Sequence, residues 1–110
     1  MYVCVIMDIS ELKVGQLIRC KKESYANNSL RLLRDPLTHN WRVSLLDYET
    51  HFYEEYSILD EDTIFTYVER CIVVTDENNY IFSWNDYRFL TLGKKVYIHE
   101  QDIKHFEPII

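Results

Sequence analysis

The alternation of apolar and polar residues predicts short β-strands along most of this 110-residue chain. Residues 2–7 are apolar on both faces of an extended segment and predict a central strand. After a turn at Gly15, residues 16–21 predict a strand whose Ile18 and Cys20 face inward and whose basic side chains face solvent.

A hairpin is expected after a polar loop over 23–29. Its two strands, 30–34 and 41–47, are joined by a turn that the Asp35-Pro36 pair initiates. The second strand alternates between an apolar and a polar face, which are formed by Trp41, Val43 and Leu45 and by Arg42 and Ser44. This alternation predicts a strand that is half-buried against a core.

The segment 48–59 follows a different period. Four apolar residues recur at spacings of four, four and three, namely Tyr48, Phe52, Tyr56 and Leu59. These spacings predict one helix, and the many aromatic residues keep a strand open as the alternative. The acidic run Asp60-Glu61-Asp62 then predicts a turn.

The longest β-rich run covers 63–75 and is expected to pair, across a turn at 76–79, with a strand over 80–84. The predicted register places Thr75 opposite Tyr80, Val73 opposite Phe82 and Cys71 opposite Trp84. These residues share the more apolar face, so the aromatic stripe of Tyr80, Phe82 and Trp84 is expected in the core. The alternative is a stacking platform for nucleic-acid bases, which basic residues should flank. Neither strand carries a basic residue nearer than Arg70.

A connection over 85–93, a strand over 94–99 and a turn-like tail over 100–110 complete the predicted elements. Five to seven short strands with at most one short helix, at about 48–59, predict a single mostly β domain spanning 1–110. The expected architecture is a small barrel or a strongly bent antiparallel sheet.

Two motifs resemble SH3-like and KOW-type barrels. The sequence 12-LKVGQLIRC-20 is similar to their opening, in which a Gly introduces a strand of alternating residues. The sequence 96-VYIHEQDI-103 is similar to their closing strand and single-turn helix. The resemblance implies an SH3-like or KOW-like barrel, although the Gly-rich loop that usually follows the first KOW strand is missing. A likeness of fold carries no function.

The chain shows no motif that carries chemistry. Three cysteines without a C-x-x-C pair predict neither a disulfide framework nor a zinc site, and the four histidines lack helical ligand spacing. Two glycines cannot form a Gly-rich phosphate loop, and the Asp60-Glu61-Asp62 run lacks the spacing of a calcium loop. We therefore expect a non-enzymatic protein that uses no metal or cofactor.

The N-terminal apolar run has neither a basic region before it nor a small-residue cleavage site after it. It is also too short to span a bilayer. We therefore expect a cytoplasmic protein that makes no membrane contact.

Charge is unevenly distributed along the chain, whose formal net charge is −6. Seven Lys and Arg lie between Lys13 and Arg42, whereas seven acids and no Lys or Arg lie between Asp47 and Asp62. One interpretation is that the two stretches neutralise each other across the fold. The other is that the acidic stretch is a face offered to a basic partner.

The acidic stretch also carries aromatic residues, and aromatic rings among charges are typical of interface hot spots. We expect the protein to bind another protein through the face formed by Tyr48, Glu49, Phe52, Tyr53, Glu54, Glu55, Tyr56, Asp60, Glu61 and Asp62. A helical row of carboxylates would mimic phosphate spacing, as in virus-encoded inhibitors. The small size and acidic pI resemble those of phage-type accessory proteins.

The alternative function is that of a nucleic-acid-binding module of the SH3-like or KOW-like kind. Its basic footprint would be formed by Arg19, Lys21, Lys22, Arg31, Arg34 and Arg42. The net negative charge opposes the approach of a polyanion, which makes this the second choice. A homodimer that pairs through an exposed edge strand at 94–99 is a further expectation.

Overall fold

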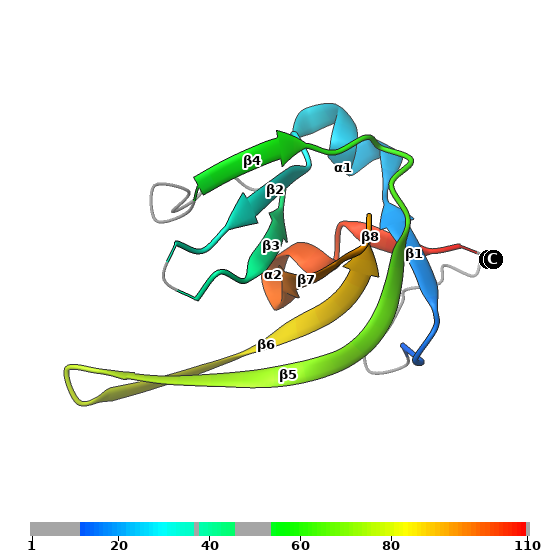
Figure 1. Cartoon of the computed structure of the whole chain (residues 1–110). Helices are drawn as coiled ribbons and strands as arrows, with labels where there is room; N and C mark the ends of the chain where they lie inside the picture. Colours follow the sequence, from blue (N-terminus) through cyan, green and yellow to red (C-terminus); the bar gives the residue numbers. More distant parts are fainter. Residues whose placement is uncertain (1–11, 37, 46–53, 110) are drawn as a thin grey trace.

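The computed structural model describes residues 12–36, 38–45 and 54–109. Its elements are β1 (Leu17–Cys20), α1 (Lys22–Asn27), β2 (Arg31–Arg34), β3 (Trp41–Ser44), β4 (Glu54–Ile58), β5 (Phe65–Glu77), β6 (Tyr80–Thr91), β7 (Lys94–His99), α2 (Glu100–Ile103) and β8 (Phe106–Pro108). The strands form one sheet in the order β4-β2-β3-β7-β6-β5-β1-β8 (Figure 1). All neighbours are antiparallel except β3 and β7, which are parallel.

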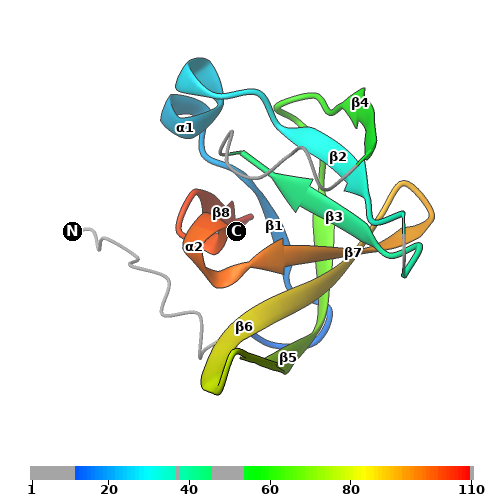
Figure 2. The ribbon, with the colours of Figure 1, turned by 90° about the vertical axis from the view of Figure 1, so that its left-hand side faces the viewer.

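The sheet curls round on itself, as the view in Figure 2 shows, and forms an open half-barrel. This confirms the predicted mostly β fold with a strongly bent sheet. The described residues contain two short helices, and neither lies at 48–59. The predicted strand at 2–7 lies outside the described residues.

The core fills the inside of the curl. Phe65 lies at its centre, in edge-to-face contact with Phe89 and Phe106 at ring-centroid distances of 6.2 and 5.4 Å. Ile18 and Cys20 are buried, which confirms the inward face predicted for β1. Burial of this apolar surface drives the curl, because a half-buried sheet must cover its apolar face.

The predicted hairpin of β2 and β3 is confirmed, with Arg31 opposite Ser44 and Arg34 opposite Trp41. The helix predicted at 48–59 is wrong over its described part. Residues Glu54–Ile58 form β4, which pairs with β2, while 48–53 lie outside the described residues. The free edge of β2 supplies backbone partners that a helix there would leave unused.

The loop predicted at 23–29 is also wrong, because Lys22–Asn27 form the helix α1. The backbone N–H groups of Ser24 and Tyr25 donate to the Lys21 carbonyl and begin the helix. Tyr25 packs against the core, and its hydroxyl donates to the Leu59 carbonyl at 3.1 Å. This tertiary contact holds the polar segment in a helix.

Two further predictions at the C-terminal end need correction. The connection predicted at 85–93 is instead the continuation of β6 as far as Thr91. The strand at 94–99 is β7, which lies between β3 and β6 and is no edge. The dimer contact predicted through it is therefore wrong, since both of its edges are already paired. The single-turn helix expected after it is confirmed as α2.

The long hairpin of β5 and β6 turns at Asn78 and Asn79, whose φ angles are 52° and 68°. Positive φ at both residues is the geometry of a two-residue hairpin turn, and Asn tolerates it. Val73 consequently faces Trp84, a register shifted by two residues from the prediction. A shift by two keeps each side chain on its predicted face.

The half of this hairpin that contains the turn projects beyond the half-barrel. We call residues 71–84 the arm (Figure 1, lower left). The aromatic stripe predicted in the core lies here, and Tyr80 and Phe82 are 68% and 51% exposed. The prediction fails because the neighbouring strands are too short. β1 pairs with β5 only at Phe65 and Thr66, and β7 pairs with β6 only from Asp86 onward.

Candidate binding groove and arm

The arm exposes apolar side chains on both faces. Ile72, Val74 and Ile81 project from one face, and Ile81 is 75% exposed. Phe82 projects from the other face, beside Tyr80 at a ring-centroid distance of 6.4 Å. Within the described residues, no third strand pairs with either edge of the arm. The arm therefore offers apolar side chains and free backbone edges together.

A cavity of about 320 Å³ opens at the base of the arm. We call it the groove. Its walls are the arm on one side and the β2–β3 turn on the other, and its lining consists of Asp35, Thr38, Asn40, Trp41, Arg42, Cys71, Val73, Trp84, Asp86 and Tyr97. Three large aromatic rings and several polar groups thus meet in one recess, which is typical of a ligand site.

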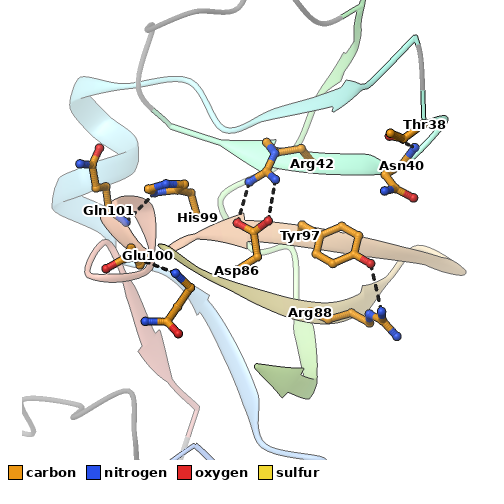
Figure 3. Close-up of polar contacts among 10 residues, drawn as sticks. Thr38, Asn40, Arg42, Asp86, Arg88, Tyr97, His99, Glu100 and Gln101 are labelled. Atoms are coloured by element: carbon orange, nitrogen blue, oxygen red, sulfur yellow. Dashed lines mark hydrogen bonds and ion pairs between the residues drawn. The ribbon is translucent and has the colours of Figure 1, made fainter. Parts of the chain in front are cut away.

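The floor of the groove is an ion pair between Arg42 and Asp86 (Figure 3). Two hydrogen bonds join them, from Nη1 to Oδ1 at 3.1 Å and from Nη2 to Oδ2 at 2.8 Å. Asp86 is only 3% exposed, so the guanidinium supplies the charge that a buried carboxylate needs. The pair connects β3 to β6 across the intervening β7.

Trp84 forms the inner wall, with its ring stacked on His99 at a centroid distance of 5.9 Å. His99 is held in turn, because its Nδ1 accepts the backbone N–H of Gln101 at 3.0 Å (Figure 3). The indole N–H of Trp84 is buried and has no hydrogen-bond partner among the described residues. A buried donor without a partner is costly, and a ligand acceptor would satisfy it.

The thiol in the groove is poorly suited to nucleophilic chemistry. Burial raises the pKa of Cys71, which disfavours the reactive thiolate. Its S–H points to Glu69 at 3.7 Å, and a carboxylate raises the thiol pKa further. Burial also lowers the pKa of His99.

A second recess of about 510 Å³ adjoins the groove and shares three lining residues with it. We call it the basic depression. It lies between the β2–β3 and β6–β7 turns and is lined by His39, Asn40, Trp41, Arg88, Gly93, Lys94, Lys95 and Tyr97. Among the described residues, no carboxylate lines it.

Aromatic rings position the cations of this depression. Arg34 and Lys94 each lie 5.4 Å from the centroid of the Trp41 ring. Arg88 lies 5.4 Å from the centroid of the Tyr97 ring and donates from Nη2 to the Tyr97 hydroxyl at 3.0 Å (Figure 3). Glu69 accepts from its Nη1 at 2.9 Å, so the charge of Arg88 is partly neutralised.

The basic residues predicted from the sequence are distributed over several elements. Arg19 on β1 pairs with Glu107 at 3.5 Å, and Lys21 and Lys22 lie at the start of α1. Arg31 begins β2. Arg42 is engaged with Asp86, so Arg34 is the member of the set that contacts the lining of the basic depression.

Most of the predicted acidic face cannot be placed. Four of its residues lie outside the described residues, namely Tyr48, Glu49, Phe52 and Tyr53. For Glu55 and Tyr56 the structure describes only the backbone, which belongs to β4. Glu54 is exposed. Asp60, Glu61 and Asp62 are exposed in the predicted turn, where the Thr63 N–H donates to the Asp60 carbonyl at 3.1 Å. The acidic face remains a prediction.

The sequence analysis missed the residues that meet in the groove and the basic depression, above all Arg88, Lys94 and Tyr97. One signal was available. Leu92-Gly93 is a two-residue hairpin turn, and reading it as such places Arg88 opposite Tyr97. No local sequence pattern indicated that Trp41 would lie beside the residues of β7, because β3 pairs with β7 in parallel across a long sequence separation.

The described part of the chain holds no group of three His, Cys, Asp or Glu that would bind a metal ion. None of its helices is long and apolar enough to cross a membrane. Comparison with protein-family models, with curated proteins and with solved structures finds no match for this chain.

Proposed function

We propose that this is a non-enzymatic binding protein that acts through protein–protein interaction, with the arm as its principal contact. The observation that supports this is the exposure of Ile72, Val74, Ile81 and Phe82 on an arm that contributes nothing to the described core. Ile72, Val74 and Ile81 share one face of the arm, and an apolar face that is exposed to this extent marks a surface that a partner covers.

The backbone of the arm specifies the kind of partner. Among the strands that the structure describes, none pairs with either edge of the arm, because β1 and β7 end before they reach it. A partner with an extended apolar segment would add a strand to one edge and cover the side chains of one face. The backbone bonds would give affinity, and the pockets for Ile81 or Phe82 would give specificity.

The acidic segment at 47–62 belongs to the same proposal as a secondary contact. Its described carboxylates at Glu54, Asp60, Glu61 and Asp62 are exposed. They would approach a basic surface of the partner and steer the encounter. A nucleic-acid-binding protein has such a surface, and covering it would inhibit that protein in the manner of a phage-type accessory protein.

The test is affinity capture from a lysate of the source cell with the wild-type chain and the variant I72T/I81T. Both substitutions keep a β-branched residue and remove apolar contact area from the arm. We expect the variant to recover the partner at least about tenfold less well. The matched control is V14T/I64T, which changes two exposed apolar residues outside the arm.

Thermal unfolding of both variants verifies that they are folded. If I72T/I81T recovers the partner as well as V14T/I64T does, the arm is not the contact. If charge reversal at Glu54 and Asp60–Asp62 leaves recovery unchanged, the acidic segment is not the secondary contact.

A further inference from the structure

The basic depression concentrates positive charge on a chain whose net charge is −6. Arg88, Lys94 and Lys95 line it, and Arg34 lies beside it on the Trp41 ring. Lys94 and Lys95 form no ion pair with any carboxylate in the described part of the chain. Such a local field attracts an anion even when the whole molecule repels one, because screening limits the reach of distant charges.

Trp41 holds two cations at the edge of this depression. Arg34 and Lys94 lie against its ring, each at 5.4 Å from the centroid. The Nε–H of Arg34 is buried and has no partner among the described residues. The Trp41 ring and His39 Nδ1, which lies 3.3 Å from Nη2, position the guanidinium, and its charge beside the depression suits phosphate oxygens.

The basic depression opens into the groove, whose walls include flat aromatic rings. Asn40, Trp41 and Tyr97 line both, and the inner wall is Trp84, whose indole N–H is unsatisfied. Thr38 and Asn40 place a hydroxyl and an amide on the rim (Figure 3). A ligand that fits has an anionic group joined to a flat ring that carries hydrogen-bonding atoms.

We propose that the groove and the basic depression together bind single-stranded nucleic acid. Phosphates contact Lys94, Lys95 and Arg34, while one base enters the groove and lies against Trp84. The base must leave its stack to enter a recess between the arm and the β2–β3 turn, so duplex is excluded. This inference goes beyond the proposed function, because it concerns the base of the arm, whereas the proposed protein contact uses the exposed end of the arm.

An acidic peptide is the competing occupant, because its carboxylates would also pair with the lysines. Its carboxylate side chains bring no flat ring to the groove, whereas every nucleotide joins a flat ring to an anionic group. Base–aromatic stacking supplies the ring contact in proteins that bind single strands. The observations therefore favour nucleic acid over an acidic peptide.

The test is fluorescence anisotropy with a labelled oligothymidylate of about 12 nucleotides. Three phosphate contacts predict that affinity falls roughly twentyfold when salt rises from about 50 to about 200 mM. K94Q/K95Q should weaken binding at low salt and make the salt dependence shallower. W84A should weaken binding about five- to a hundredfold and leave the salt dependence unchanged, because stacking involves no counterion.

The matched control is K13Q/K22Q, which removes the same charge at two exposed lysines outside the basic depression. It should bind like wild type, and so should the arm variant I72T/I81T. The latter result separates this inference from the proposed protein contact. Circular dichroism of each variant verifies its fold.

Several results would overturn the inference. They are the absence of binding at low salt, equal binding of duplex, equal weakening by K13Q/K22Q, and full affinity in a folded W84A. Polyglutamate that competes as well as unlabelled oligothymidylate would identify the acidic peptide as the occupant.

Discussion

At the scale of single residues, the turn between β6 and β7 holds Leu92 in a conformation that its side chain disfavours. Its φ is 50°, and the following Gly93 has a φ of 75°. The left-handed conformation costs an ordinary L-residue about 1–2 kcal/mol, and Asn adopts it more readily. Leu92 is also 66% exposed, so its side chain gains little burial in return.

We therefore predict that L92N raises the free energy of unfolding by about 1 kcal/mol in urea denaturation. The reverse change at the arm turn, N79L, should lower it, because Asn79 has a φ of 68°. A lower stability for L92N would show that the exposed leucine makes a contact worth more than the strain.

His99 makes stability depend on pH. Burial lowers its pKa below the ordinary value of 6.5, and the charge of Arg42 lowers it further, whereas Asp86 and Glu100 oppose the shift. The unfolded chain therefore takes up a proton near pH 6.5 that the folded protein resists. Stability is fully present above that pH and is lost as the pH falls through the folded pKa.

Replacing His99 by Asn keeps an acceptor for the Gln101 N–H and removes the titration. We predict that the free energy of unfolding of H99N falls less than that of wild type between about pH 7.5 and about pH 5. Burial also lowers the pKa of His105, so H99N/H105N should fall still less. An identical fall in wild type and H99N would contradict the prediction.

At the scale of elements, the connection between β3 and β7 is one of the two shortest in the sheet, together with that between β1 and β5. It consists of two residue pairs, Trp41 with Val96 and Arg42 with Tyr97. It nevertheless joins β4-β2-β3 to the other five strands. The Arg42–Asp86 pair crosses β7 at this place and fastens β3 to β6.

We predict that R42A lowers the free energy of unfolding by about 3–5 kcal/mol, because it leaves Asp86 buried and unpaired. The double variant R42M/D86L removes both charges and should recover most of that loss. Urea denaturation measures both. A loss below about 1 kcal/mol for R42A would mean that water or another cation compensates Asp86.

Local pattern predicted the elements whose partners are adjacent in sequence. Ile18 and Cys20 face inward as their alternation indicates, and β2 pairs with β3 across the Asp35-Pro36 turn. The helical spacing at 48–59 misled because its described part is an edge strand on β2. Edge pairing depends on a neighbour, and a single segment does not encode it.

Exposure of the arm was unpredictable for a related reason. Val73, Phe82 and Trp84 alternate as they would in a buried hairpin, and only the lengths of β1 and β7 decide whether anything covers them. The groove was hidden likewise, since Trp41 and Tyr97 come together through the parallel contact of β3 with β7. Residues such as these carry site chemistry that local periodicity cannot locate.

At the scale of the whole molecule, the half-barrel and the arm are structurally distinct parts. The arm stretches the molecule to 46 Å along one axis, against 28 and 26 Å along the others. None of the described core residues comes from 73–84. Val73 and Trp84 nevertheless line the groove, so the base of the arm connects the two proposed binding surfaces. A partner that moves the arm would therefore alter the groove.

This division predicts the effect of removing the arm. Replacing 73–84 by Asn-Gly joins Ile72 to Asn85, which already face each other, through a two-residue turn. We expect the shortened chain to fold with its free energy of unfolding within about 2 kcal/mol of wild type, because the core is intact. Its radius of gyration should fall below 14.2 Å.

Urea denaturation and small-angle X-ray scattering provide these two measurements. The shortened chain should lose the protein partner. It should also bind oligothymidylate more weakly, because the deletion removes Trp84, which forms the inner wall of the groove. The arm variant I72T/I81T is the control that should lose the partner alone. A shortened chain that fails to fold would contradict the division, because the arm would then be required for the half-barrel to form.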